Sequence, residues 1–251
     1  MPPIALQLYT VRDLAAKNFP EALRQVAKIG YAGVEFAGLH GMPAMDVAAL
    51  LRELGLKSSS AHTAMPTPEN IAAIAADAKT LGHRHIISGT DSKQLQTRAD
   101  VDAWAARYAA GATLAAQHGL TLGLHNHWWE LDHQVEGKTP FEWIMAGAPG
   151  IFSELDVYWC QVAGLNPADF IRRHAARIPL LHIKDGNLNP PSPMTAVGQG
   201  KLDFAAIAAA ADSKILQWMI VELDACATDM LQAVADSYQF LTSKKLAQGR
   251  K

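Results

Sequence analysis

Ionisable side chains lie inside several short apolar runs of this 251-residue sequence. Two runs show the pattern clearly: residues 180–185 read LLHIKD, and residues 219–224 read MIVELD. Burying a carboxylate or an imidazole is costly unless the group has a partner. Because such groups recur at the ends of several runs, we interpret them as satisfying one another around a divalent cation.

Each of these residues also has a plainer interpretation when taken alone. A lone histidine at a strand end is more often a hydrogen-bonding core group than a ligand, and a lone acid more often caps a helix. The chain has ten histidines and two cysteines, so a metal would be held by imidazole and carboxylate rather than thiolate. Such ligands suit Mn²⁺, Co²⁺, Mg²⁺ or Zn²⁺, and no sequence feature selects one of them.

A cation held in this way can polarise a carbonyl group. A neighbouring carboxylate or histidine can then move a proton at the adjacent carbon. This chemistry serves isomerases, epimerases and dehydrating lyases equally well.

The elements that must position these residues are short and regularly spaced. Several helical stretches end in a glycine, as at Gly30, Gly55, Gly82 and Gly119, and an apolar run follows each one. Eight strand–helix units in about 250 residues predict a single (β/α)8 barrel over residues 1–251, with an open doubly wound sheet as the alternative. The predicted strands lie near residues 4–9, 33–37, 57–61, 84–88, 120–125, 152–156, 179–184 and 218–223.

Composition excludes several classes of protein. Apolar residues make up 49% of the chain, which indicates a globular domain rather than a disordered chain. The formal net charge is −2, so we expect no nucleic-acid partner. No apolar run reaches membrane-spanning length, so we expect no membrane association. The first residues, MPPI, lack a signal-peptide pattern, so we expect a cytoplasmic location and reduced cysteines.

The segment 187–200 follows the seventh predicted strand and is rich in Asn, Pro and Gly. In a barrel it would be a long loop on the active-site face. Gly198 and Gly200 offer a weak signal for a phosphate-binding nest. We expect the tail, residues 243–251, to be solvated.

The whole chain resembles the xylose isomerase-like TIM barrels, and specifically the sugar phosphate isomerase/epimerase group. The matching segments, in chain order, are LQLYTVRD (6–13), GYAGVE (30–35), HNH (125–127), ELDVYW (154–159), LHIKD (181–185), VGQGKLDF (197–204) and VE (221–222). The resemblance implies a barrel enzyme with a divalent cation bound at the ends of strands five to eight.

The resemblance assigns three ligands directly: Asp156, His182 and Glu222. For the fourth we assign Glu130, with His127 or His125 as competitors, because His125 stands where the epimerases carry a glutamate. The resemblance further implies catalytic roles for Glu222, Glu130, His62 and Lys184. The predicted substrate-binding residues are Gln7, Glu35, His127, Trp128, Trp159 and Asp185.

The leading hypothesis is therefore a metal-dependent isomerase or epimerase acting on a keto-sugar or sugar phosphate. The alternative is a metal-dependent lyase acting on a keto-inositol or 3-keto-glycoside, because inosose dehydratases also have a histidine-rich end of strand five. In both cases the partner is a small carbohydrate. Members of the family are often dimers or tetramers, so a homo-oligomer is also an expectation. A hydrolase of abasic DNA shares the fold, but the near-neutral charge argues against it.

Overall fold

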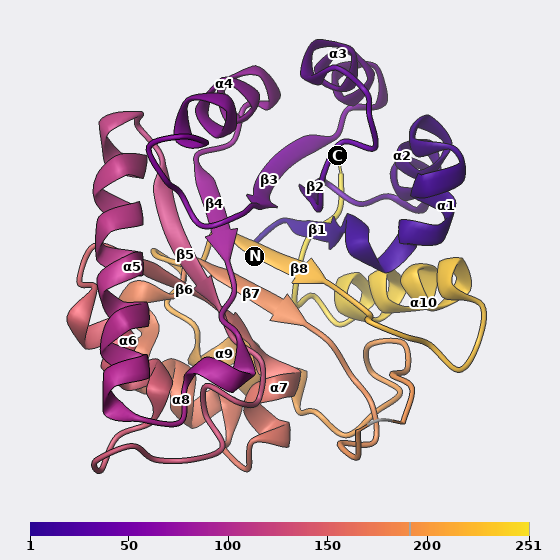
Figure 1. The fold of residues 1–251 in the computed structure, drawn as a ribbon. Coiled ribbons are helices and arrows are strands. Elements are labelled where there is room, and N and C mark those ends of the chain that lie inside the picture. Colours follow the sequence, from indigo (N-terminus) through magenta and orange to yellow (C-terminus); the bar gives the residue numbers. More distant parts are fainter. Residues whose placement is uncertain (191, 251) are drawn as a thin grey trace.

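Eight short parallel strands close into a barrel in the computed structural model, which describes residues 1–190 and 192–250 (Figure 1). β1 closes the barrel against β8, with Ala5 opposite Ile220. Each predicted run contains one strand, so the predicted (β/α)8 fold is confirmed. The strands are β1 (Ile4–Gln7), β2 (Gly33–Phe36), β3 (Lys57–His62), β4 (His85–Ser88), β5 (Thr121–His125), β6 (Phe152–Asp156), β7 (Leu180–Ile183) and β8 (Trp218–Val221).

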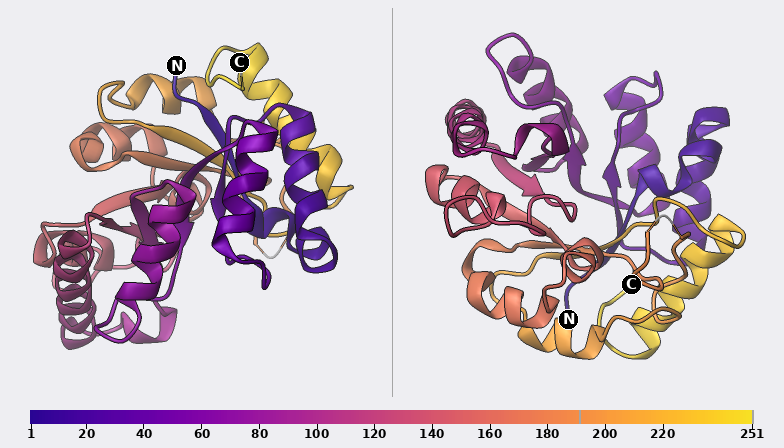
Figure 2. Two further views of the ribbon diagram at one scale, coloured as in Figure 1. Left: turned by 90° about the horizontal axis from the view of Figure 1, so that it is seen from above. Right: turned by 60° about the horizontal axis from the view of Figure 1, so that its bottom comes forward.

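Helices surround the strands on all sides (Figures 1 and 2). Their ends follow local sequence signals. Gly30 adopts a left-handed conformation and closes α2, and the Asn166 side chain caps α8 by accepting from the Asp169 amide. The helices are α1 (Arg12–Lys17), α2 (Phe19–Ile29), α3 (Ala44–Leu54), α4 (Ile71–Leu81), α5 (Arg98–Gln117), α6 (Pro140–Gly147), α7 (Val157–Val162), α8 (Pro167–His174), α9 (Phe204–Ala210) and α10 (Met230–Ser243), with 3₁₀ turns η1 (Leu8–Val11), η2 (Ser92–Gln94) and η3 (Ala175–Arg177).

Two apolar cores hold the barrel together. The larger one fills the space between strands and helices. The smaller one lies inside the barrel and consists of Ala5, Ile87, Phe152, Leu180 and Ile220. Because alternate residues of a strand face the interior, the next inward positions toward the carboxyl ends lie directly above this small core. Those positions carry the polar side chains described below.

The C-terminal tail packs in part against the body of the barrel. The expectation of a solvated tail holds for residues 243–245 and for the exposed Gln248 and Arg250, is wrong for Leu246, Ala247 and Gly249, and lies outside the described residues for Lys251. Ala247 is buried, and Gln248 pairs with Pro3 beside β1. The Arg250 guanidinium donates to the Ala27 and Leu54 carbonyl oxygens. Both carbonyl oxygens lie in the last turns of helices, α2 and α3, where the negative end of the helix dipole favours a positive charge.

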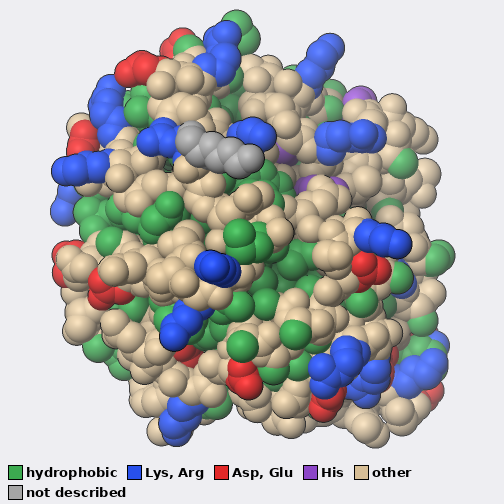
Figure 3. Space-filling model, turned by 180° about the vertical axis from the view of Figure 1, so that it is seen from behind, with side chains coloured by type: hydrophobic (Ala, Val, Ile, Leu, Met, Phe, Trp, Pro, Cys, Tyr) green, Lys and Arg blue, Asp and Glu red, His purple; other side chains and the backbone are tan. Residues whose placement is uncertain are grey.

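Charged side chains are dispersed over the face of the molecule seen in Figure 3, where Lys and Arg alternate with Asp and Glu rather than forming one basic patch. Within the described residues, no helix is both long and apolar enough to cross a bilayer. The expected lack of a nucleic-acid partner stays a prediction.

Candidate functional site

A cavity of about 830 Å³ opens at the carboxyl ends of the strands. This is the end of a (β/α)8 barrel where active sites lie. Polar and aromatic side chains share its wall. The lining includes Gln7, Tyr9, His62, His125, His127, Trp128, Trp129, Trp159, Lys184, Glu222 and Asp224.

Four potential metal ligands converge at the carboxyl ends of the strands, and two of them, His125 and Glu222, line the cavity. His125 ends β5, Asp156 ends β6, His182 lies in β7, and Glu222 follows β8. One ligand atom from each lies within 4.8 Å of the others, and all four side chains are buried. The structure thus brings together three of the predicted ligands, with His125 rather than Glu130 beside them.

Two sets of hydrogen bonds hold Asp156 in place. It caps α7, since its Oδ1 accepts from the Trp159 amide at 2.9 Å. The Asn126 side chain bridges β5 and β6, because its Oδ1 accepts from the Asp156 amide and its Nδ2 donates to the Asp156 carbonyl oxygen. The second carboxylate oxygen, Oδ2, is left without a hydrogen bond although Lys184 Nζ lies 3.2 Å away.

His182 is fixed through both of its ring nitrogens. Nδ1 lies 2.9 Å from Glu222 Oε2, and Nε2 lies 2.6 Å from Glu35 Oε1. Glu35 also accepts hydrogen bonds from Gln7 Nε2 and from the Ser60 hydroxyl. Despite burial, His62 and His182 hold the pKa of Glu35 well below its usual range.

His62 and Glu154 form a second imidazole–carboxylate pair. His62 Nε2 lies 2.7 Å from Glu154 Oε2, and the His62 side chain remains 27% exposed toward the cavity. Burial opposes the charge on His62, but Glu35 and Glu154 raise its pKa to about 10. Burial and the neighbouring Glu35 carboxylate raise the pKa of Glu154 to about 8.

Lys184 is buried among three carboxylates. Its Nζ lies 2.8 Å from Glu222 Oε2, 2.9 Å from Asp224 Oδ2 and 3.2 Å from Asp156 Oδ2. Despite burial, these carboxylates raise its pKa well above the usual value, so the ammonium group stays charged.

The donor set fits a divalent cation. Burial raises the pKa of Asp156 to about 6, although the nearby Lys184 and His182 oppose this rise. Burial and the positive charges of neighbouring side chains, first His182, lower the pKa of His125, so its imidazole is neutral. His125 Nδ1 and Asp156 Oδ2 are buried without a hydrogen-bond partner. Metal binding requires neutral imidazole and carboxylate. Despite burial, Glu154, Glu35 and Glu222 raise the pKa of His182 well above its usual value, so a cation bound here would replace a proton on His182.

The predicted ligand Glu130 lies elsewhere. Its two carboxylate oxygens accept hydrogen bonds from the Thr90 hydroxyl and from the His127 amide, the latter at 2.8 Å. Glu130 is fully buried and does not belong to the four converging ligands. It is also absent from a second converging set, which consists of His62, His125, Glu154 and His182. It ties the loop after β4 to the loop after β5, and burial raises its pKa to about 7.

Asp185 organises the long loop after β7 instead of facing the cavity. Its carboxylate accepts hydrogen bonds from the amides of Gly186, Gly198, Gly200, Lys201 and Leu202. The amides that suggested a phosphate nest are therefore already occupied by a carboxylate of the chain itself.

Aromatic rings form one wall of the cavity. The ring centroids of Trp128 and Trp159 lie 4.7 Å apart, and His127 stacks on Trp129 at 4.0 Å. Burial and the charge on Lys184 lower the pKa of His127 to about 3, so this imidazole is uncharged. The predicted residues Gln7, His127, Trp128 and Trp159 all line the cavity, whereas Glu35 and Asp185 do not.

Sequence reasoning did not assign Glu154, Asp224, Asn126 or Tyr9 to the site. A signal for Glu154 was present, since Glu154 and Asp156 are two residues apart in one strand and so share a face. The same spacing relates Glu222 to Asp224. Asn126 carries no comparable signal, because its role depends on the register between β5 and β6.

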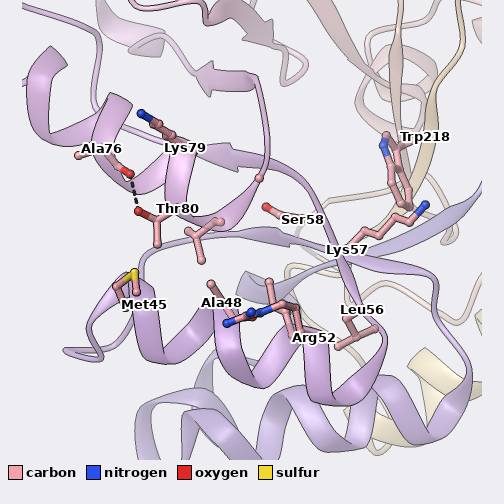
Figure 4. Close-up of a pocket in the computed structure, with 13 residues that line it drawn as sticks. Met45, Ala48, Arg52, Leu56, Lys57, Ser58, Ala76, Lys79, Thr80 and Trp218 are labelled. Atoms are coloured by element: carbon pink, nitrogen blue, oxygen red, sulfur yellow. Dashed lines mark hydrogen bonds between the residues drawn. The ribbon is translucent and has the colours of Figure 1, made fainter.

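A second cavity, of about 840 Å³, lies outside the barrel between α3 and α4 (Figure 4). Arg52 and Lys79 come from these two helices, and Lys57 extends toward Trp218. No carboxylate or imidazole is among the described residues that line it. It therefore lacks the groups needed for metal binding or proton transfer.

The chain can be compared with known proteins at this point. Residues 23–244 match the family described as the xylose isomerase-like TIM barrel. The chain belongs to this family. No curated protein sequence matches it.

Solved structures of the same fold are distant in sequence. A sugar phosphate isomerase/epimerase from Parabacteroides distasonis ATCC 8503 has a TM-score of 0.80 and 20% identity, covering 98% of this chain and 95% of the other. A probable 3-DHS dehydratase from Bacillus anthracis has a TM-score of 0.75 and 13% identity, covering 96% and 99%. The IolI protein with a bound zinc atom has a TM-score of 0.71 and 15% identity, covering 96% and 98%. At these identities the similarity shows the fold, and the reaction must be argued from the site.

Proposed function

We propose that this protein is a divalent-metal-dependent sugar isomerase or epimerase. The observation that carries the proposal is the convergence of His125 and three further ligands, Asp156, His182 and Glu222, next to an open cavity that His125 and Glu222 line. A cation bound by them would polarise a sugar carbonyl and make the adjacent C–H group more acidic. In this proposal the fourth metal ligand is His125, and not Glu130 as the sequence predicted.

Two side chains on the cavity wall are in opposite protonation states. Despite burial, Lys184 and His182 hold the pKa of Glu222 well below its usual range, so Glu222 is an ionised proton acceptor. His62 is protonated at neutral pH and is held by Glu154, so it is a proton donor. Such a pair can remove a proton at one carbon and return one at another position or on another face.

Lys184 supplies fixed positive charge beside these groups. Its ammonium group is buried and lines the cavity. A preorganised cation stabilises negative charge that develops on a substrate oxygen as the proton leaves. Trp128 and Trp159 give the sugar ring an apolar surface on the same wall.

Solvent-exchange labelling tests the proposal. The protein loaded with Mn²⁺ or Co²⁺ is incubated in D₂O with a panel of keto-sugars, and the products are followed by mass spectrometry and NMR. We expect deuterium at the carbon next to the carbonyl without loss of a leaving group. Asp156→Asn should abolish the exchange, and the exposed control Asp77→Asn should retain it. Absence of exchange with every sugar would contradict the proposal.

A carbon–oxygen lyase acting on a keto-inositol or 3-keto-glycoside is the second candidate. It is favoured by one observation, that β5 ends in a histidine with a lowered pKa rather than in a second carboxylate. An elimination needs a base next to the carbonyl and a leaving group, but not two carboxylates on opposite sides. Loss of water or of an aglycone in the same experiment would favour this candidate.

A further inference from the structure

Each positively charged side chain at the cavity is engaged by other groups of the chain, including His62, whose Nε2 lies 2.7 Å from Glu154 and 3.3 Å from Glu35. Among the described residues that line the cavity, Lys184 is the one lysine or arginine, and its ammonium group is shared by Asp156, Glu222 and Asp224. Arg12 lies nearby on α1, but its guanidinium donates to the Tyr9 and Asp224 carbonyl oxygens and packs over the Tyr9 ring. The charge of Lys184 is therefore balanced by carboxylates of the chain, and Arg12 is held by carbonyl oxygens, so neither is an unpaired cation for a phosphate dianion.

The usual phosphate-binding elements of a barrel are also occupied. In TIM barrels a phosphate commonly binds to the loops after strands seven and eight and to a helix N-terminus there. Here Asp185 takes the amides of the loop after β7. Asp203 caps α9 and Asp229 caps α10, each accepting a first-turn amide with its own side chain. A carboxylate of the chain therefore stands at the loop after β7 and at the N-terminus of each of these two helices.

The rest of the cavity favours an uncharged ligand. The aromatic wall of Trp128, Trp129 and Trp159 offers apolar faces. Two acidic residues, Glu222 and Asp224, also line the cavity. Burial raises the free-energy cost of placing further negative charge beside them.

We infer that this site accepts unphosphorylated, uncharged sugars and rejects their phosphate esters. The inference rests on the proposed function, whose substrate class it narrows. It differs from what the name sugar phosphate isomerase/epimerase suggests for the structural neighbour. Phosphate esters are rejected because carboxylates of the chain hold the cations and amides that a phosphate group would need. The same carboxylates repel the negative charge of the phosphate.

Matched ligand pairs test this inference. Quenching of tryptophan fluorescence reports binding, since Trp128 and Trp159 line the cavity. The metal-loaded protein is titrated with D-fructose and D-fructose 6-phosphate, with D-ribulose and D-ribulose 5-phosphate, and with inorganic phosphate. We expect each neutral sugar to bind at least about tenfold more tightly than its ester, because like charges in the site oppose the phosphate. Inorganic phosphate should leave the fluorescence unchanged.

A charge variant sharpens the test. Ala64 is exposed on the cavity wall, so Ala64→Lys adds a free cation at the mouth and Ala64→Gln serves as the uncharged control. The lysine variant should tighten binding of the esters and leave the neutral sugars unchanged. Equal or tighter binding of the esters by the wild-type protein would overturn the inference, as would the absence of binding by any neutral sugar. Binding of the esters together with deuterium exchange would overturn the inference and support the proposed function. Binding of the neutral sugars without deuterium exchange would support the inference and contradict the proposed function.

Discussion

Glu35 Oε1 lies 2.6 Å from His182 Nε2, and both side chains are fully buried. The other ring nitrogen, Nδ1, faces Glu222. Gln7 and Ser60 donate to Glu35 and leave its carboxylate little freedom. A carboxylate that accepts the far N–H of a histidine fixes its tautomer and orients the other nitrogen toward a metal. Glu35 is thus a positioning residue for His182 rather than part of the cavity wall.

We expect Glu35→Gln to weaken metal binding by about 10- to 100-fold, the usual effect of removing such a partner. The amide is a weaker acceptor than the carboxylate and makes His182 a poorer ligand. Titration with Co²⁺, followed by its absorption spectrum, measures the change. The exposed Glu53→Gln on α3 is the control for loss of one negative charge. An unchanged affinity in Glu35→Gln would show that Glu35 only fills space.

Glu130 should make the stability of the metal-free protein depend on pH. Burial raises its folded-state pKa to about 7 from an ordinary value of 4.5, so the folded state holds the proton more tightly than the unfolded chain. This contribution is fully present below pH 4.5 and is lost as the pH rises through 7. It amounts to about 3 kcal/mol, and Asp156 acts in the same direction.

Urea unfolding at pH 5 and pH 8 measures this dependence. Glu130→Gln cannot titrate and should show a clearly smaller difference between the two pH values. A pH dependence equal to that of the wild-type protein would mean that Glu130 does not titrate in this range.

Gly200 should tolerate no side chain. A Cβ placed there would collide with the Asp185 carboxylate and the Gly186 amide nitrogen, and Asp185 is buried and cannot move aside. We expect Gly200→Ala to disturb the loop and to cost about 1–3 kcal/mol. Hydrogen exchange of the 198–202 amides should speed up. Gly150→Ala is the matched control, since its Cβ would meet only Ala112 at an ordinary 3.7 Å. Unchanged protection in Gly200→Ala would contradict the role of Asp185.

We expect Trp128 to contribute to sugar binding and not to metal binding. It packs 4.7 Å from Trp159 on the cavity wall. Removing its ring in Trp128→Ala should weaken sugar binding by about 1 kcal/mol, a factor of roughly five in KM. Trp143, which lies on α6 and does not line the cavity, provides the control Trp143→Ala. Loss of bound metal in Trp128→Ala would instead indicate a structural role.

The sequence predicted the barrel because each element carries its own signal. Glycines close helices before strands, and each strand is a short apolar run, so the order β1 to β8 follows from local pattern. The inward residues at strand ends, such as Asp156 and His182, could be predicted for the same reason. Their side chains converge because parallel strands end together.

Other parts of the site depend on contacts that no local pattern contains. Glu130 follows β5 closely, but the backbone turns its carboxylate toward Thr90 and the His127 amide. Asp185 follows directly on Lys184, yet it meets amides up to Leu202 because the loop folds back over it. The packing of the tail against Pro3 likewise depends on tertiary structure.

Metal content tests the central claim most directly, that His125, Asp156, His182 and Glu222 hold one divalent cation. The protein is saturated with Mn²⁺, Co²⁺ or Zn²⁺ and desalted, and the bound metal is measured by mass spectrometry for the wild type, His125→Ala, Asp156→Asn and Glu130→Gln. We predict about one ion per chain in the wild type and in Glu130→Gln, and loss of the ion in the other two variants. A wild type that binds none, or a Glu130→Gln variant that alone loses the ion, would contradict the account.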